Sequence, residues 1–316
     1  MGLLDFLTEA IGVDPGSYCL RIAKDGKIIF NEPSQISFNK TDSTVSGIGQ
    51  SIRSTNNDVV FSPVDYSIKD FQAFEMLLRS ALKKSIPSNS FITKSYIQYF
   101  AIPTNTTEAD KRIYRDSGEY AGAKQIYLIH QSCCSAIGMN ILYEKKNFVI
   151  IDFGAGKIET TIFANSLPIS TRAFRFGTIK IYYLIKNLLR RSYGISVSDT
   201  DIENIFDNIE NPKIEIQYTI VNGNEIKDLI YNFFSLANDS ITETIEQVSN
   251  HHDIEKVVTN GVYFTGGGSK IEFLRNQIKL DSRIKYTISK NPELDCVNGL
   301  INVIANKERF KDYLMV

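Results

Sequence analysis

Asp152 lies where an apolar run, residues 148–151, gives way to a turn of small residues. The residues of that turn are Gly154, Ala155, Gly156 and Lys157. Glycines allow backbone N–H groups to approach a polyphosphate closely, and a neighbouring carboxylate can hold Mg²⁺ through water. Residues 158–163 then alternate as a second strand. The pattern predicts a buried β-hairpin with an acidic tip, although an ordinary hairpin with an Asp-initiated turn has the same pattern.

A similar hairpin is predicted near the N-terminus, about half a chain earlier. There Asp14 precedes Gly16, Ser17 and Tyr18, and strands are predicted at residues 18–22 and 27–30. Two hairpins of this kind predict two similarly built halves that face one ligand.

A third turn follows the apolar residues 261–265 and consists of Gly266, Gly267, Gly268 and Ser269. A helix is predicted to open at Ser269. Three glycines between a strand and a helix allow close backbone approach, and the helix N-terminus is positive. This turn is therefore a candidate site for a flat or phosphorylated ligand.

With three such turns in this order, the chain resembles the superfamily of actin, sugar kinases and heat-shock chaperone ATPases, and within it the bacterial MreB family. The resemblance covers nearly the whole chain. It extends to residues 31–34, 120–124, 126–129, 136–138, 190–194 and 264–268, where MreB proteins have closely similar residues.

The resemblance implies an α/β fold, actin-like and ribonuclease H-like, in which two duplicated lobes flank a nucleotide cleft and the outer subdomains are reduced. The first lobe is expected at residues 1–145, with a small subdomain at about 41–60. The second is expected at residues 146–299, with a small subdomain at about 195–224. Residues 300–316 are expected to return to the first lobe.

The resemblance also implies that ATP and Mg²⁺ bind in this cleft. Asp14 and Asp152 are expected to hold Mg²⁺ through water, while the turns of the two hairpins grip the phosphates. The turn at residues 266–269 is expected to lie under the adenosine. Gln131 occupies the position where MreB proteins carry the acid that positions the attacking water. An amide orients water without acting as a strong base, so any ATP hydrolysis is expected to be slow.

Several positions depart from the MreB pattern. Ile179 replaces a carboxylate, Phe206 and Asn208 replace the Lys and Glu that contact ribose and base, and Tyr18 is bulkier than usual. Lys157 replaces a Thr. Two interpretations of Lys157 remain open: it contacts phosphate directly and replaces part of the Mg²⁺ charge, or it is a solvated hairpin lysine.

The composition sets limits on location and partners. The 316 residues suffice for two domains with separate cores. A net charge of −1 and a pI of about 6.4 give no attraction to nucleic acid. The four cysteines, Cys19, Cys133, Cys134 and Cys296, have no CxxC spacing, which indicates a reduced cytoplasmic setting. No apolar run reaches the ~18 residues that span a bilayer.

Residues 2–11 carry several apolar side chains. On a helix, Leu3, Leu7 and Ile11 would share one face. Such a helix would lie in the inner face of the cytoplasmic membrane, as in resembling bacterial proteins, or pack on its own domain or a neighbouring subunit. A second stretch, His251, His252 and Asp253, is predicted to be a loop and not a metal site, because adjacent loop side chains diverge and no third ligand is evident.

The leading hypothesis is an MreB-like protein that binds ATP and polymerises into membrane-associated filaments for cell shape and cell-wall morphogenesis, with cell-shape membrane proteins as partners. The alternative is a degenerate actin-like scaffold that binds nucleotide weakly or not at all and acts through protein contacts. A small-molecule kinase would need a second pocket with an Asp base, for which there is no candidate beyond the aspartates of the two hairpin turns. A chaperone is not expected, because no peptide-binding domain follows Val316.

Overall fold

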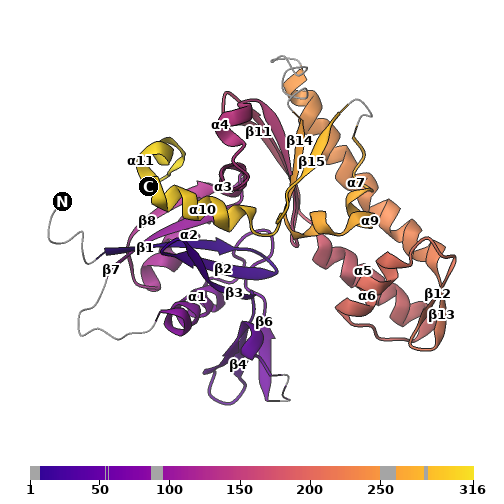
Figure 1. Cartoon of the computed structure of the whole chain (residues 1–316). Helices are drawn as coiled ribbons and strands as arrows, with labels where there is room; N and C mark the ends of the chain where they lie inside the picture. The colour runs from indigo at the N-terminus through magenta and orange to yellow at the C-terminus, as the bar shows by residue number, and fades with distance from the viewer. Residues whose placement is uncertain (1–7, 54, 56, 87–94, 250–260, 281–283) are drawn as a thin grey trace. The chain divides into compact units, whose positions relative to one another are not determined.

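The computed structural model describes residues 8–53, 55, 57–86, 95–249, 261–280 and 284–316. They form two compact units, which are described separately (Figure 1). The first unit comprises Met1–Lys145 and Leu294–Val316, and the second comprises Lys146–Glu293.

The first unit is built on a five-stranded sheet with the order β3-β2-β1-β7-β8. Its strands are β1 (Thr8–Pro15), β2 (Cys19–Lys24), β3 (Lys27–Pro33), β7 (Ser95–Ile102) and β8 (Ala123–His130). Strands β1 to β3 form an antiparallel meander, whereas β7 runs parallel to β1 and β8 parallel to β7. The three parallel strands therefore end at the same edge of the sheet, where ligands of α/β proteins commonly bind.

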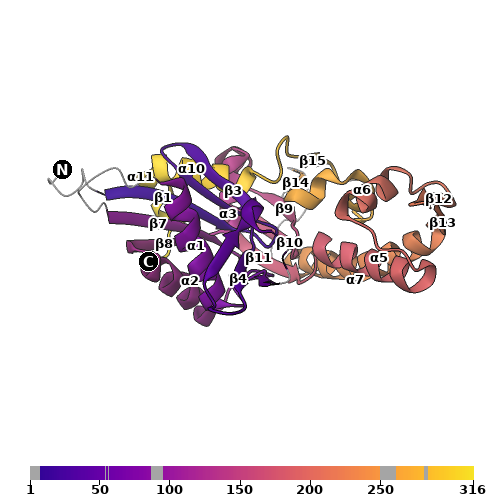
Figure 2. The same ribbon diagram turned by 90° about the horizontal axis from the view of Figure 1, so that it is seen from below.

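Helices cover both faces of this sheet. Figure 2 shows its strands between α10 (Asp295–Ala305) on one side and α1 (Phe71–Ser85) and α2 (Glu108–Tyr120) on the other. Helix α1 begins at an Asp70 cap and buries an apolar face that includes Phe74, Leu77, Leu78 and Ala81. Helix α2 begins at a Thr107 cap, whose side chain accepts a hydrogen bond from the N–H of Asp110. Helix α3 (Gln131–Gly138) follows β8 directly, and the short α4 (Leu142–Lys145) comes next.

The second unit repeats this sheet, with the order β11-β10-β9-β14-β15. Its strands are β9 (Phe148–Phe153), β10 (Ile158–Ala164), β11 (Leu167–Phe174), β14 (Val262–Thr265) and β15 (Tyr286–Ile288). The directions also match, because β9 to β11 form an antiparallel meander and β14 and β15 run parallel to β9. The prediction of two similarly built halves is confirmed.

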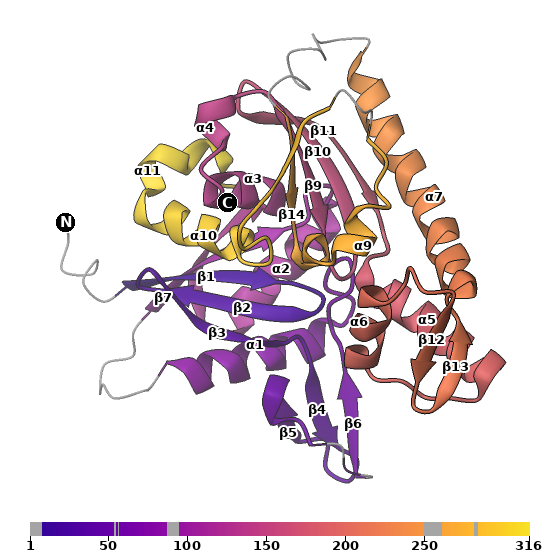
Figure 3. The ribbon, with the colours of Figure 1, turned by 45° about the vertical axis from the view of Figure 1, so that its right-hand side comes forward.

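The helices of the second unit are α5 (Thr178–Tyr193), α6 (Asp199–Asp207), α7 (Gly223–Ser249) and the short α9 (Glu272–Arg275). Helix α7 runs along β11 and β10 (Figure 3). The predicted helix opening at Ser269 is instead a 3₁₀ turn, η3 (Gly267–Lys270), followed by α9.

The chain returns to the first unit at Leu294, earlier than the sequence-based position at residue 300. The reason is that α10 packs against α3 along its length. A Cβ at Gly138 would overlap the carbonyl oxygen of Asp295, and one at Gly299 would overlap that of Cys134. The two helix backbones are therefore in direct contact, which only glycine permits. After α10 come α11 (Lys307–Phe310) and η4 (Lys311–Tyr313).

Each unit carries one small additional sheet. In the first unit, β4 (Ile36–Asn39), β5 (Val45–Ile48) and β6 (Asp58–Phe61) form a sheet of order β5-β4-β6, with the 3₁₀ turn η2 (Gly49–Ser51) after β5. In the second unit, β12 (Lys213–Ile216) and β13 (Thr219–Asn222) form a hairpin. Both lie close to the stretches expected to form reduced outer subdomains.

The N-terminal expectation needs a correction. Residues 8–11 form the start of β1, and Ile11 is fully buried in the core, so they are not part of an amphipathic helix. Residues 1–7 lie outside the described residues, as do His251, His252 and Asp253. None of the helices in the described ranges has the length and apolar character needed to cross a bilayer.

Candidate functional site

The hairpin of the second unit places its acidic residue at a strand end. Asp152 is directly opposite Glu159 in the β9–β10 register. The turn between the strands is closed by a hydrogen bond of 2.8 Å from the Gly154 N–H to the carbonyl oxygen of Lys157. The Asp152 side chain is 15% exposed. The candidate residues of this turn therefore form one compact β-turn beside a partly accessible carboxylate.

Lys157 lies inside this hairpin. Its Nζ is 2.9 Å from Oε2 of Glu159 and 3.9 Å from Oδ2 of Asp152. The Lys157 side chain is 8% exposed and that of Glu159 is fully buried. Residues two apart on a strand point to the same face, which brings Lys157 beside Glu159. The interpretation of Lys157 as a solvated hairpin lysine is therefore wrong.

The triple-glycine turn packs directly on Asp152. A Cβ at Gly266 would overlap Oδ1 of Asp152, and one at Gly268 would lie 2.8 Å from the Phe153 ring. At Gly267 the nearest atom would be Cβ of Glu293, at 3.8 Å. A Cβ at Gly267 would thus make no close contact, unlike one at Gly266 or Gly268.

Ser269 stabilises the glycine turn through a hydrogen bond within it. Its side chain is fully buried, and its hydroxyl donates a hydrogen bond of 2.6 Å to the carbonyl oxygen of Thr265. The hydroxyl is thereby used to close the glycine turn.

The start of α5 is bonded to the hairpin turn. The N–H of Thr178 donates to the carbonyl oxygen of Gly154 at 3.3 Å, and the N–H of Ile179 donates to that of Ala155 at 3.0 Å. The first N–H groups of a helix lack partners within the helix, and here the turn supplies them. The Ile179 side chain, which replaces an acid of the MreB pattern, is 44% exposed.

The two residues that replace the ribose and base contacts have structural roles. Phe206 is buried and stacks between Tyr182 and Phe273, with ring centroids 5.9 and 6.2 Å apart. Asn208 ends α6, and its side-chain amide donates to the carbonyl oxygen of Asn204. Phe206 therefore adds apolar packing where the resemblance implies a charged contact.

In the first unit, the hairpin aspartate Asp14 has a basic partner. Asp14 is directly opposite Arg21 in the β1–β2 register, and Nη1 of Arg21 lies 3.5 Å from Oδ2 of Asp14. Both side chains are largely buried. Burial raises the pKa of the neighbouring Cys19 thiol, an effect that Arg21 opposes and Asp14 reinforces.

The turn after Asp14 is held by hydrogen bonds within the first unit. The hydroxyl of Ser17 donates to the carbonyl oxygen of Asp65, and the N–H of Gly16 donates to that of Asp14 at 3.1 Å. The Tyr18 side chain is 61% exposed. The Tyr18 ring is therefore not part of the core of this unit.

Gln131 is the first residue of α3, directly after the end of β8. Its side chain is buried at the sheet edge where β1, β7 and β8 end. The hydroxyl of the next residue, Ser132, accepts a hydrogen bond of 2.8 Å from the hydroxyl of Thr104, which lies two residues after the end of β7. The parallel strands thereby place Gln131 at the same edge as Asp14.

The carboxylates expected to hold Mg²⁺ do not suit that role well. Each already has a basic partner in its own unit, Arg21 for Asp14 and Lys157 for Asp152. Among the described residues, no group of three or more His, Cys, Asp and Glu side chains is placed to hold a metal ion. A divalent ion at either carboxylate would experience repulsion from the neighbouring cation.

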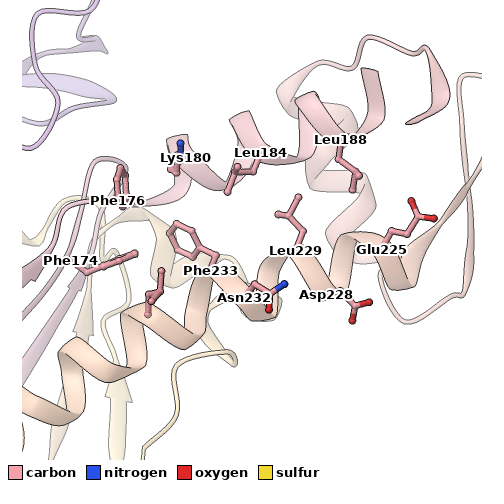
Figure 4. Close-up of a pocket in the computed structure, with 11 residues that line it drawn as sticks. Phe174, Phe176, Lys180, Leu184, Leu188, Glu225, Asp228, Leu229, Asn232 and Phe233 are labelled. Atoms are coloured by element: carbon pink, nitrogen blue, oxygen red, sulfur yellow. The ribbon is translucent and has the colours of Figure 1, made fainter. Parts of the chain in front are cut away.

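A separate groove of about 730 Å³ lies between α5 and α7 (Figure 4). Apolar side chains such as Phe174, Leu184 and Phe233 line most of it. Its one lysine, Lys180, lies over the rings of Phe176 and Tyr183 at 5.5 and 5.1 Å. A triphosphate requires converging N–H groups or cations, so this groove is not the candidate nucleotide site.

Sequence reasoning did not find the partners Glu159 and Arg21. A signal was present for both, because each follows its hairpin aspartate by seven residues, and Glu159 is two residues after Lys157. In an antiparallel hairpin of that length, the aspartate and the seventh residue face each other across the strands.

Comparison with known proteins gives consistent results. Residues 8–312 match the family model described as MreB/Mbl protein. The cell shape-determining protein Mbl of Bacillus subtilis is 22% identical over 312 residues, covering 91% of this chain and 92% of Mbl. The cell shape-determining protein MreB of Escherichia coli is 24% identical over 315 residues, covering 91% of this chain and 90% of MreB.

Solved structures resemble the chain over almost its full length. MreB5 of Spiroplasma citri bound to ADP has a TM-score of 0.81 at 18% identity, covering 96% of this chain and 98% of MreB5. The AMPPNP-bound form has a TM-score of 0.80 with the same coverage. The MamK double helical filament has a TM-score of 0.71 at 13% identity, covering 94% of this chain and 99% of MamK. The fold is therefore shared.

Proposed function

The chain belongs to the MreB/Mbl protein family and has the actin-like fold, and from this premise we propose that it binds ATP and assembles with copies of itself into filaments that serve cell shape. Mbl and MreB are both named cell shape-determining proteins. MreB5 was solved with ADP and with AMPPNP, and MamK as a double helical filament. These relatives support each part of the proposal.

The observation that carries the proposal is the contact between the glycine turn and the hairpin in the second unit. Gly266 lies against the carboxylate of Asp152, and the turn at residues 154–157 is bonded to the start of α5. In this half-site Gly154, Ala155, Gly156 and Lys157 bind phosphate, and the open side of the turn at Gly267 receives the adenosine.

The first unit supplies the other half-site. The backbone of Gly16, Ser17 and Tyr18 binds phosphate, and the amide of Gln131 orients the attacking water. Because an amide is a weak base, hydrolysis is slow and serves assembly turnover. Nucleotide binding favours a conformation that makes head-to-tail contacts between subunits, and such a heterologous contact builds an open filament.

The test of this proposal combines two measurements. ATP at one hundred times its Kd should stabilise the folded chain by about 2.7 kcal/mol, which raises the melting temperature. Sedimentation should place the protein in the pellet with ATP and in the supernatant without it. An unchanged melting temperature at millimolar ATP, with or without Mg²⁺, would exclude the nucleotide site.

One observation favours the alternative of a scaffold that works through protein contacts alone. Phe206 occupies the core where the resemblance implies a contact to ribose and base. For a scaffold, sedimentation would be the same with and without ATP, and the melting temperature would not respond to nucleotide.

The membrane part of the proposal concerns the N-terminal segment. We place the protein in the cytoplasm at the inner face of the cytoplasmic membrane, near cell-shape and cell-wall membrane proteins, with residues 2–7 as the lipid contact. Residues 8–11 pair with β7, and Ile11 also pairs with β2, so a deletion that tests this idea must stop at residue 7. The shortened protein should lose flotation with lipid vesicles, and a full-length protein that never floats would refute the idea.

A further inference from the structure

The hairpin at Asp152 contains a buried cation between two carboxylates. Nζ of Lys157 is 2.9 Å from Glu159 and 3.9 Å from Asp152, with the three side chains 8%, 0% and 15% exposed. A buried carboxylate is costly unless a cation compensates for it. Glu159 therefore holds the ammonium of Lys157 at this place in the hairpin.

The ammonium of Lys157 lies beside Asp152, the carboxylate that would otherwise attract a divalent ion. Charges at such distances interact strongly where water is largely excluded. Lys157, Glu159 and Asp152 together carry a net charge of −1, whereas the two carboxylates without the lysine would carry −2. Lys157 therefore weakens the attraction of this hairpin for a divalent ion and weakens its repulsion of a triphosphate.

In the first unit a basic side chain likewise lies beside the hairpin aspartate. Arg21 faces Asp14 across the β1–β2 pair, and its Nη1 is 3.5 Å from Oδ2 of Asp14. Each hairpin that approaches the phosphates in the proposed site therefore contains its own basic side chain.

From these contacts we infer that Lys157 supplies positive charge that a divalent ion would otherwise bring, so that this chain binds nucleoside triphosphate without a requirement for Mg²⁺. The inference rests on the proposed nucleotide site. It concerns binding only, and it assigns Lys157 as a phosphate-binding residue.

The first test measures the ATP affinity of the full chain by calorimetric titration in EDTA and in Mg²⁺. The two dissociation constants should agree within about threefold, a difference well below the tenfold that corresponds to about 1.4 kcal/mol. Binding that occurs only with Mg²⁺ would overturn this inference and leave the proposed function standing. Absence of binding in both conditions would overturn the proposed function and this inference together.

The second test assigns the effect to Lys157. The double variant Lys157→Gln with Glu159→Gln removes both buried charges at once, so neither group is left uncompensated. Its ATP affinity in EDTA should fall at least tenfold and recover when Mg²⁺ is added. A matched control, Lys227→Gln with Glu210→Gln, removes an ion pair of 2.8 Å elsewhere in the same unit and should bind ATP as the wild type does.

Unchanged ATP affinity of the double variant in EDTA would refute the role of Lys157. Thermal unfolding of both double variants shows whether the hairpin has remained folded. The wild-type titration decides the central claim even where the double variant does not fold.

Discussion

Gly266→Ala is expected to destabilise the second unit by about 3 kcal/mol or more, for two separate reasons. Gly266 has φ 81° and ψ 149°, a backbone conformation that residues other than glycine adopt only at a cost of ~1–3 kcal/mol. The added Cβ would also overlap Oδ1 of Asp152 and lie 2.5 Å from the carbonyl oxygen of Phe153. Overpacking of this kind costs a further ~1–3 kcal/mol.

The neighbouring Gly267→Ala is the matched control for stability. Its Cβ would have no atom nearer than Cβ of Glu293 at 3.8 Å, and its φ is not positive. Its stability should therefore stay within ~0.5 kcal/mol of the wild type. On the proposed function it should instead weaken ATP binding, because the methyl group projects to the side of the turn that receives the ligand. The Gly266→Ala variant should thus lose stability, whereas the Gly267→Ala variant should keep its stability and lose ATP affinity.

Differential scanning calorimetry of the full chain measures the first effect, because it resolves separate transitions if the two units unfold independently. For a unit of this size, 3 kcal/mol corresponds to a decrease of ~6–12 °C in the melting temperature. Equal melting temperatures for the Gly266→Ala and Gly267→Ala variants would refute the packing of the glycine turn on Asp152.

The remaining predictions concern the first unit. Gly299→Ala should cost about 3 kcal/mol in urea unfolding, because its Cβ would overlap the carbonyl oxygen of Cys134 and lie 2.5 Å from the carbonyl carbon. Gln131→Ala should slow ATP hydrolysis, measured as release of phosphate, at least tenfold, which corresponds to an increase of about 1.4 kcal/mol in the activation free energy. Its ATP affinity should stay unchanged. Glu9→Gln should lower the urea midpoint at neutral pH, because Lys24 pairs with Glu9 at 2.8 Å. That bond raises the pKa of Lys24 above its ordinary 10.5, so the stabilisation is complete below that value and is lost as pH rises through the raised pKa.

Each of these predictions has an outcome that contradicts it. Gly194→Ala, at φ 70° with no atom within 4 Å of the added Cβ, should cost only backbone strain of ~1 kcal/mol. Equal costs for Gly194→Ala and Gly299→Ala would contradict the close crossing of α10 and α3. An undiminished rate in Gln131→Ala would remove its role. A Glu9→Gln effect of the same size at neutral pH and above the raised pKa of Lys24 would contradict the ion pair.

Much of the site was predictable from local spacing. An aspartate, a turn of small residues and a following strand predict each of the two hairpins, and in both the aspartate pairs with the seventh residue after it. The glycines at 266–268 mark a turn that needs close packing, and the structure places Gly266 against Asp152. Such features depend on residues within about ten positions of each other, which is the range over which turn and strand patterns act.

Other features depended on segments far apart in the chain. Phe206 stacks with Phe273, and its type alone does not distinguish a ligand contact from a core residue. Ile11 continues the helical spacing of Leu3 and Leu7, but residues 8–11 form a strand, because all four pair with β7 and Ile11 also pairs with β2. Tertiary pairing overrides local preference in such short segments.

The sequence by itself determined the duplicated hairpins, the glycine turn after the strand at residues 261–265 and the membership in an actin-like family, because these follow from the order and spacing of residue types. Only the tertiary structure decided that Lys157 is buried beside Glu159 and Asp152, and that α10 lies backbone to backbone on α3. The physical reason is that burial and charge compensation depend on which surfaces exclude water, and that is fixed only when distant segments pack together.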